Sequence, residues 1–340
     1  MGKPALDPVR RVVPPPPPRS AARRGAVPFP PARRIPVSGD GPEDVVVDAA
    51  GRLLCGVAGG RILHIDPQRG TEEVVGTTGG RPLGLEVLPD GRVLVCDADR
   101  GLVRLDPQSG AVETLVERVG GVPLRFCSNA SWAPDGSIWF TQSTDRFDFE
   151  HYLGAFLEHR PSGRLLRRDP DGSVDVVLRD LYFPNGVSVT SDGGALLFVE
   201  TAGYSLSRVP LTGPRAGERE VLVDDLPGFP DNLSRHRDGR VWIAMVNPRD
   251  RRLDRLGSTP PWLRRVLWRI PDRLLPSPAR TTWVMAVDEG GVVELDLQAD
   301  RDDYHGVTGV AEHDGSLYLA SVFEDALLEV DLREQGAGAS

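Results

Sequence analysis

The 340-residue chain is long enough to bury a large core, as one large domain or two ordinary ones. It contains 38 glycines and 31 prolines but few aromatic residues, a composition typical of folds with many tight turns rather than long helices. The formal net charge of −9 leaves no basic surplus to neutralise phosphates, so it argues against a nucleic-acid partner and favours a cation or a neutral small molecule.

The chain begins with a Pro/Arg-rich arm over residues 1–35, in which Pro14 to Pro18 are consecutive. Such a segment favours extended polyproline II structure. The arm is locally basic in an acidic protein, so we interpret it as a solvated segment that packs partly on the domain, or as one that binds a partner or an anionic surface. It has no continuous apolar stretch of the kind found in secretory signals, and no run reaches the ~20 apolar residues of an integral membrane segment.

The three cysteines, Cys55, Cys96 and Cys127, are odd in number and far apart in the sequence. Cys55 and Cys96 lie in apolar, strand-like runs, which predicts buried free thiols rather than disulfides. Free thiols favour a reducing compartment, so we expect a cytoplasmic location.

From about residue 40 the chain repeats a pattern in which a turn containing glycine leads into a short apolar strand, a second turn and another strand. The turn glycines of the six copies are Gly51, Gly91, Gly136, Gly193, Gly239 and Gly315. Repeats of about 40–50 residues that each carry several short strands indicate a β-propeller, because ring closure covers the faces that one copy leaves bare. Long amphipathic helices do not alternate with the strands, which argues against a parallel α/β fold. We therefore predict an all-β, six-bladed β-propeller over residues 36–334, followed by a flexible tail at 335–340.

Two insertions interrupt the repeat, at about residues 147–159 and 247–282. In the first, the apolar residues have helical spacing. In the second, Trp262 to Ile270 form a basic amphipathic helix that Pro271 ends. We predict two short helical insertions on one face, packed on the propeller or forming a lid over a substrate mouth. A membrane-surface role for the second helix is an alternative.

Polar side chains stand just before the expected innermost strands of four copies. They are Glu43, Asn129, Asn185 and the pair Asp231-Asn232. Each alone is more typical of an ordinary Asx turn, but the innermost strands of a propeller begin near its axis, so together they would converge. Calcium takes about six to eight oxygen ligands of this kind, and two carboxylates would neutralise its charge. The sequence thus predicts a site for Ca2+, or for another divalent cation, on the axis.

Several motifs in this chain resemble the strictosidine synthase-like branch of the SMP-30/gluconolactonase/paraoxonase superfamily. The motifs are Pro42–Asp44, Arg160–Leu166, Phe183–Val187, Leu226–Asn232 and Glu312–Tyr318. The resemblance covers about residues 40–332 and implies a six-bladed propeller. In the metal-dependent members a Glu, two Asn and an Asp hold calcium, and these roles fall here on Glu43, Asn129, Asn185 and Asp231, with Asn232 as a neighbour.

One position departs from the pattern that the resemblance implies. Plant strictosidine synthase uses a catalytic glutamate a few residues before its last Glu-His-Asp-Gly motif, and the matching residue here is Thr308. The group that would transfer protons in a Pictet–Spengler condensation is therefore missing, which disfavours a C–N lyase or synthase.

We accordingly expect a calcium-dependent hydrolase that acts on a lactone or related ester, with the metal polarising a small-molecule substrate. Asp231 is the first candidate to activate water or attack directly, and His305 is a candidate proton shuttle because histidine titrates near neutrality. A binding propeller with a purely structural metal is the alternative from another class. The sequence contains no Gly-x-Ser-x-Gly elbow or Walker loop, so serine-hydrolase and nucleotide chemistry lose support.

Overall fold

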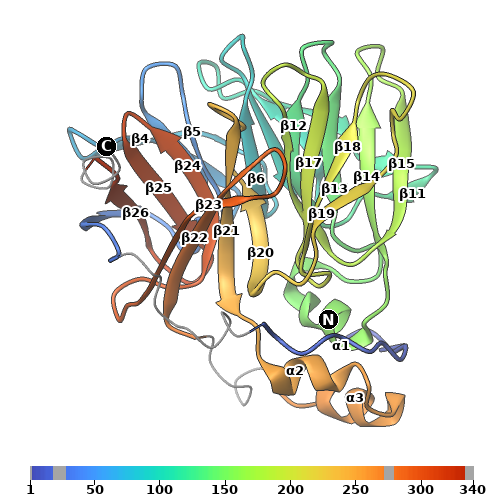
Figure 1. The fold of residues 1–340 in the computed structure, drawn as a ribbon. Coiled ribbons are helices and arrows are strands. Elements are labelled where there is room, and N and C mark those ends of the chain that lie inside the picture. Colours follow the sequence, from blue (N-terminus) through green and yellow to red (C-terminus); the bar gives the residue numbers. More distant parts are fainter. Residues whose placement is uncertain (1, 18–27, 272–278, 334–340) are drawn as a thin grey trace.

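The structure is a computed structural model that describes residues 2–17, 28–271 and 279–333. Its strands form six four-stranded antiparallel sheets arranged as blades around one axis, which confirms the predicted propeller (Figure 1). The predicted tail at 335–340 lies outside the described residues, as do residues 18–27 of the arm and 272–278 of the second insertion.

Each of the first five blades is a meander of four consecutive strands, numbered from the axis outwards. Blade 1 consists of β2 (Val45–Val47), β3 (Leu53–Gly56), β4 (Arg61–Asp66) and β5 (Thr71–Thr77). Blade 2 consists of β6 (Pro82–Val87), β7 (Val93–Asp97), β8 (Gly101–Leu105) and β9 (Val112–Val116). Blade 3 consists of β12 (Cys127–Trp132), β13 (Ile138–Gln142), β14 (Gly163–Arg168) and β15 (Val174–Leu181). Blade 4 consists of β16 (Pro184–Val189), β17 (Ala195–Glu200), β18 (Ser205–Pro210) and β19 (Glu220–Val223). Blade 5 consists of β20 (Gly228–Leu233), β21 (Arg240–Pro248), β22 (Thr281–Asp288) and β23 (Val293–Asp300). A small hairpin, β10 (Arg118–Val119) and β11 (Val122–Pro123), joins blades 2 and 3.

Blade 6 combines the two ends of the propeller chain. It contains β24 (Val307–His313), β25 (Ser316–Ser321), β26 (Ala326–Asp331) and, as its outermost strand, β1 (Ala32–Pro36). β1 pairs antiparallel with β26, so that Ala32 lies opposite Val330. The ring therefore starts at Ala32, and not at residue 36, because closure needs a fourth strand that only the preceding segment supplies.

The blades are held together by apolar side chains between neighbouring sheets. Every residue of β7 and β17 is buried, whereas the outer strands β5 and β19 alternate with exposed positions. A strand covered on both faces must be apolar throughout, which explains why these runs lack the usual alternation. The predicted burial of Cys55, Cys96 and Cys127 is confirmed, and all three thiols are free.

Both insertions lie at one end of the propeller, shown at the bottom of Figure 1. The first forms a 3-10 turn (Phe149–His151) and α1 (Leu153–Glu158), and the second forms α2 (Arg251–Leu256) and α3 (Pro261–Trp268). The predicted helix from Trp262 to Ile270 is thus real but slightly shorter. The separate α2, which begins at the N-cap Asp250, was not anticipated.

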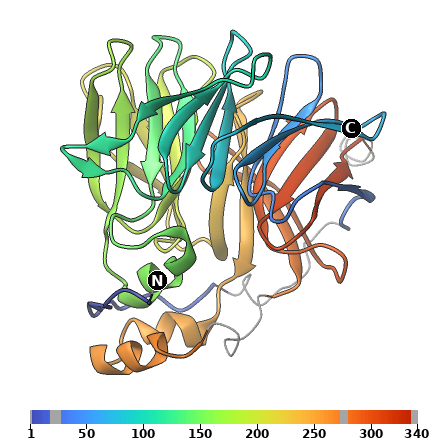
Figure 2. The same ribbon diagram turned by 180° about the vertical axis from the view of Figure 1, so that it is seen from behind.

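The N-terminal arm ties the two insertions together. Residues 2–17 contain no helix or strand, and Figures 1 and 2 show them running between α1 and the α2–α3 pair. The fully buried Arg264 of α3 donates hydrogen bonds to the carbonyls of Val9 (2.9 Å) and Leu157 (3.0 Å). The buried Glu158 of α1 accepts the backbone N–H of Asp7 and pairs with Arg146 at 2.6 Å. The helical end is therefore one packed cover rather than two independent loops.

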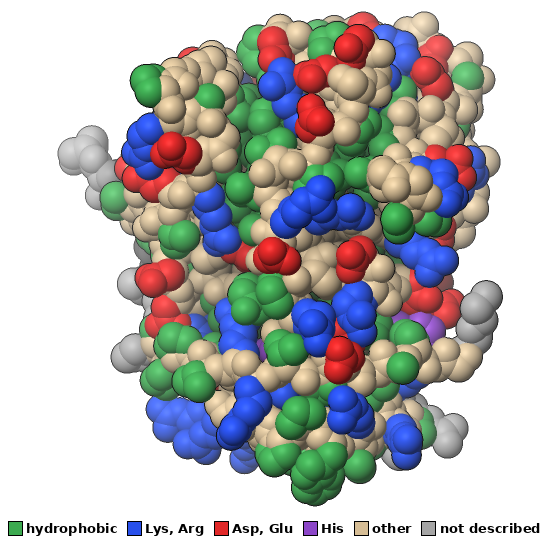
Figure 3. Space-filling view, turned by 90° about the vertical axis from the view of Figure 1, so that its right-hand side faces the viewer, with side chains coloured by type: hydrophobic (Ala, Val, Ile, Leu, Met, Phe, Trp, Pro, Cys, Tyr) green, Lys and Arg blue, Asp and Glu red, His purple; other side chains and the backbone are tan. Residues whose placement is uncertain are grey.

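The outer surface of this cover is both basic and apolar. Leu253, Trp262 and Val266 are exposed, Trp262 by 63%, whereas Trp268 points inward. Figure 3 shows hydrophobic and basic side chains gathered at the lower end of one side of the molecule, the end that carries these helices in Figure 1. Among the described residues, no helix combines the length and the apolar character that crossing a membrane requires.

Replacing Arg264 by alanine should release the arm, because it leaves buried carbonyls of Val9 and Leu157 without a donor at a cost of about 2 kcal/mol or more. Hydrogen exchange of residues 2–17 should become faster while exchange in the blades stays unchanged. The matched control is Arg269→Ala, since Arg269 is exposed at the end of the same helix. Equal exchange in both variants would show that Arg264 does not hold the arm.

Candidate functional site

The candidate site is built from irregularities of the innermost strands. The pairing of β6, β12, β16, β20 and β24 with the next strand of each blade shifts by one residue, and the extra residue is a β-bulge. A bulge bends its strand and redirects side chains, and here each one turns toward the axis. In blade 1 the equivalent residues directly precede β2.

Each bulge presents two consecutive residues, which we call the axial pair of that blade. In blade order the axial pairs are Glu43-Asp44, Leu83-Gly84, Ser128-Asn129, Asn185-Gly186, Asp231-Asn232 and Thr308-Gly309. The second member is polar in blades 1, 3 and 5 and glycine in blades 2, 4 and 6. Blades 1, 3 and 5 therefore contribute polar side chains, and the glycines of blades 2, 4 and 6 leave space for them.

The three glycines are needed because the blades approach so closely at the axis. A Cβ on Gly84 would lie 2.5 Å from the Nδ2 atom of Asn129, and one on Gly309 would lie 2.5 Å from the Oδ1 atom of Asp44. A Cβ on Gly186 would clash with the backbone of Leu233. None of these glycines is required for a left-handed turn, so their role here is close packing.

Hydrogen bonds join the axial pairs into one buried network. Asn129 Nδ2 donates to Asn232 Oδ1 at 3.0 Å, and Asn232 Nδ2 donates to Glu43 Oε2 at 3.1 Å. Asn185 Nδ2 donates to Asp231 Oδ1. These contacts connect blades 3, 5 and 1, and blades 4 and 5, through side chains that are all at least nine-tenths buried.

Side chains of the network also satisfy backbone groups that the bulges leave free. Asp44 Oδ2 accepts the N–H of Leu85 at 2.9 Å, and Asn129 Oδ1 accepts the N–H of Val187 at 3.2 Å. Each of these bonds crosses from one blade to the next. These side chains therefore stabilise the ring, whatever chemistry they also perform, because a buried N–H group without a hydrogen-bond acceptor would destabilise the fold.

Three carboxylates lie buried in this small volume. Burial raises the pKa of Glu43 well above its usual range, and the charges of Asp231 and Asp44 add to the effect, whereas Arg81 acts in the opposite direction. Burial, together with Asp44, likewise raises the pKa of Asp231. Burial raises the pKa of Asp44 to about 7 against the hydrogen bonds from Leu85 and Val45. The site thus concentrates negative charge that a cation would stabilise.

The donor set fits a hard divalent cation. The carboxylates of Glu43 and Asp231 and the amide oxygens of Asn129, Asn185 and Asn232 are all oxygen ligands of the kind that calcium prefers. The amide oxygen of Asn185 accepts the Ser128 hydroxyl at 2.9 Å and keeps a second lone pair for a ligand. Within the described residues there is no cluster of three His, Cys, Asp or Glu that could hold a metal, so the amides are essential to this argument.

The structure brings together Glu43, Asn129, Asn185, Asp231 and Asn232, as expected from the sequence. It differs in detail, because all but Glu43 lie inside their strands at the bulges rather than in turns before them. Bulges leave little trace in a hydrophobic pattern, which explains the difference.

His305 does not join this cluster. Its Nδ1 atom lies 2.6 Å from Glu324, and its ring stacks on Phe323 with centroids 5.7 Å apart. Thr308 does reach the axis, where its hydroxyl donates to the carbonyl of Glu43 at 2.6 Å. The role of Thr308 is therefore to connect blades 6 and 1.

Sequence reasoning missed several contributors to the site. Asp44, Ser128, Gly84 and Gly309 are not singled out in the sequence analysis. Their signal is positional, since each occupies the same place in its repeat as Glu43-Asp44 or Asp231-Asn232. Aligning the six copies on the residue after each axial pair, from Val45 to Val310, identifies them.

An aromatic layer separates the axial pairs from the helical cover. Phe126 and Phe183 precede the axial pairs of blades 3 and 4, and their ring centroids lie 5.2 Å apart. Phe156 of α1 packs on Phe183 at 4.9 Å and on Phe229 at 6.0 Å. Since Phe126 and Phe183 are buried, these rings give this side of the site an apolar surface.

Comparison with known proteins places the chain among such propellers. The sequence model of the SMP-30/gluconolactonase/LRE-like region matches residues 41–258. The chain is 35% identical over 269 residues to the adipocyte plasma membrane-associated protein of Salmo salar, which covers 74% of this chain and 64% of that protein. It is 30% identical over 338 residues to strictosidine synthase-like protein 10 of Arabidopsis thaliana, which covers 89% of each.

Solved structures show the same fold. A gluconolactonase from Xanthomonas campestris superposes with a TM-score of 0.64 at 19% identity, over 97% of this chain and 99% of that one. Regucalcin from Agrobacterium tumefaciens, described as a calcium-binding protein, gives 0.63 at 18% identity, over 90% and 94%. Because the family model covers more than half of the chain, the chain belongs to the SMP-30/gluconolactonase/LRE-like family, with strictosidine synthase-like proteins among its relatives.

Proposed function

We propose that this protein is a calcium-dependent hydrolase of a lactone or related ester. The observation that carries the proposal is the convergence of two carboxylates, Glu43 and Asp231, with three amide side chains in one buried network at the axis. A gluconolactonase and a calcium-binding regucalcin share the fold, which is consistent with the proposal, although they resemble this chain in fold alone.

The residues that would hold the cation are Glu43, Asn129, Asn185, Asp231 and Asn232. When bound, calcium supplies Lewis-acid polarisation of the ester carbonyl and stabilises the negative charge that develops on its oxygen. The amides contribute oxygen ligands without adding charge, so two carboxylates are enough to balance the dication. The hydrogen bonds among these side chains fix their positions before substrate arrives.

Asp231 is the residue best placed to act on water. Its carboxylate is held by Asn185 Nδ2, and because a carboxylate bound to a metal is a weak base, the cation would supply much of the activation of the water. In the proposed reaction water adds to the carbonyl carbon and its proton passes to Asp231. The bond from carbon to the ring or ester oxygen then breaks, and the leaving alkoxide takes the proton back. The products are an acid and an alcohol, with atoms and charge balanced.

The arrangement of Thr308 argues against the synthase alternative. Its hydroxyl already donates to the carbonyl of Glu43, and a threonine cannot serve as a carboxylate base at that position. The other alternative, a binding propeller with a structural cation, shares the same ligands and differs only in lacking turnover.

The aromatic layer defines the substrate class further. A substrate that approaches from the helical end meets Phe126, Phe156 and Phe183 before it reaches the axial pairs. Such a wall favours aryl or alkyl groups over sugar hydroxyls, which would lose their hydrogen bonds to water there. The proposed substrates are therefore apolar lactones or aryl esters.

Replacing Asp231 by asparagine should lower kcat/KM for the best ester or lactone by about 100-fold or more, because the proton acceptor and one ligand charge are lost. Circular dichroism should show an intact propeller. The control is Asp302→Asn, since the Asp302 side chain is fully exposed. Unchanged turnover in the Asp231 variant would remove it from the mechanism.

Removing calcium with a chelator should abolish turnover and lower the thermal stability, because the buried carboxylates then lose their counter-charge. Calcium at 100 times its Kd should restore activity and raise Tm by roughly 5 °C. Metal analysis of the purified protein and calorimetry in both states check this. A Tm response without turnover on any ester would favour the structural-cation alternative. No calcium binding at all would refute the site.

A substrate panel should show at least about tenfold higher kcat/KM for phenyl acetate and alkyl-substituted lactones than for gluconolactone, because of the apolar wall. Phe156→Ala should reduce this preference, whereas Phe323→Ala, at an exposed position beside His305, should not. A preference for gluconolactone would contradict the proposed substrate class while leaving the hydrolase itself intact.

A further inference from the structure

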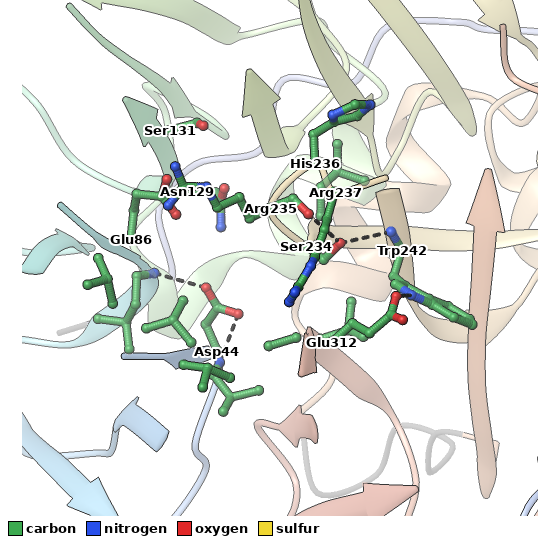
Figure 4. Close-up of a pocket in the computed structure, with 18 of the residues that line it drawn as sticks. Asp44, Glu86, Asn129, Ser131, Ser234, Arg235, His236, Arg237, Trp242 and Glu312 are labelled. Carbon is green, nitrogen blue, oxygen red and sulfur yellow. Dashed lines mark hydrogen bonds between the residues drawn. The ribbon is translucent and has the colours of Figure 1, made fainter. Parts of the chain in front are cut away.

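A cavity lies at the end of the propeller axis opposite the helices. Its volume is about 340 Å3. The innermost strands run from the axial pairs away from the helical cover, and the cavity is lined by the residues that follow those pairs, such as Val87, Arg235 and Glu312. Asp44 and Asn129 are also among its lining residues, and Asn129 is at the same time one of the proposed cation ligands (Figure 4).

Most polar groups of this cavity already have partners. Glu312 accepts hydrogen bonds from Trp242 Nε1 at 2.7 Å and from Arg240 at 3.0 Å. The hydroxyl oxygens of Ser131 and Ser234 accept the backbone N–H groups of Val189 and Trp242, respectively. These side chains form the wall and have little capacity left for a ligand.

Glu86 is different. Glu86 belongs to β6 and is only 7% exposed. In the described parts of the chain, no group donates a hydrogen bond to its carboxylate. Burial raises its pKa to about 7, and the positive charge of Arg235 acts in the opposite direction. The Glu86 carboxylate faces the cavity, where a group with its own hydrogen-bond donors would satisfy it.

Arg235 is the complementary group. Arg235 is exposed, its guanidinium lies over the ring of Trp132 at 5.3 Å, and within the described ranges it forms no ion pair with Glu86 or another carboxylate. Figure 4 shows Arg235 and Glu86 as parts of the same lining, Glu86 on β6 of blade 2 and Arg235 in the segment that follows β20 of blade 5. The remaining walls include Val46, Val87 and Val310, which are apolar.

We propose that this cavity binds a small zwitterion of amino-acid size, with its ammonium on Glu86, its carboxylate on Arg235 and an apolar side chain against the valine walls. An ammonium supplies three donors to the unpartnered carboxylate, and a carboxylate matches the two-pronged guanidinium. A single cation would leave Arg235 unused, and a single anion would lie beside the Glu86 carboxylate. The site is separate from the hydrolase function, so either stands without the other.

The test is calorimetric titration of the full-length protein with three probes that share one apolar tail. Leucine carries both charged groups, 3-methylbutylamine lacks the carboxylate, and 4-methylpentanoate lacks the amine. Leucine should bind about tenfold or more tightly than either analogue. Titrations with calcium and with chelator should give the same affinity, which separates this site from the axial cation.

Two variants assign the contacts. Glu86→Gln should weaken leucine about tenfold or more but not weaken 4-methylpentanoate, whose carboxylate no longer meets a like charge, and Arg235→Gln should weaken leucine but not 3-methylbutylamine. Arg237→Gln is the control, since Arg237 is exposed at the same rim and lies near Asp238. Thermal melts verify folding of each variant.

Three results would overturn the proposal. The first is that leucine does not bind at about 10 mM, roughly 100 times the dissociation constant expected of a specific small-ligand site. The second is equal affinity for all three probes. The third is an equal loss of affinity in the Arg237 control.

Discussion

The burial of three carboxylates at the propeller axis is the constraint on which the rest of the structure depends. Glu43, Asp44 and Asp231 are brought together from blades 1 and 5 by ring closure, and burial opposes the charge of each. Their amide neighbours and the backbone N–H of Leu85 offset part of this cost. A bound cation would offset the remaining cost of burying these charges, so the carboxylates that destabilise the empty axis also make it a candidate cation site.

Fold and site share the same residues. The hydrogen bonds that connect blades across the axis use Asp44, Asn129 and Thr308, and the glycines of the alternate blades provide the room for them. The last blade is completed by β1, which pairs with β26 and fixes the ends of the ring. A change at the axis therefore affects ring closure as well as chemistry, because a loose ring would not hold the ligands at their spacing.

The two ends of the axis have opposite character. At the helical end the arm and α1 to α3 form one packed cover above an aromatic layer, so this side of the axial pairs is apolar. At the other end a cavity with apolar and polar walls contains the carboxylate of Glu86 and the guanidinium of Arg235, which are not paired with each other. This asymmetry arises because both insertions follow strands that run toward the same end.

The sequence by itself determined the six-bladed ring and four places where polar groups meet the axis, because every copy of the repeat enters its innermost strand at the same position. It also located both helical insertions and the replacement at Thr308. Only the tertiary structure decided that the polar residues sit in bulges, that residues from Ala32 complete blade 6, and that His305 turns to Glu324. It alone showed that Glu86 and Arg235, from blades 2 and 5, share a cavity. The reason is physical: periodicity is a local property of the chain, whereas hydrogen-bond satisfaction depends on partners from distant blades.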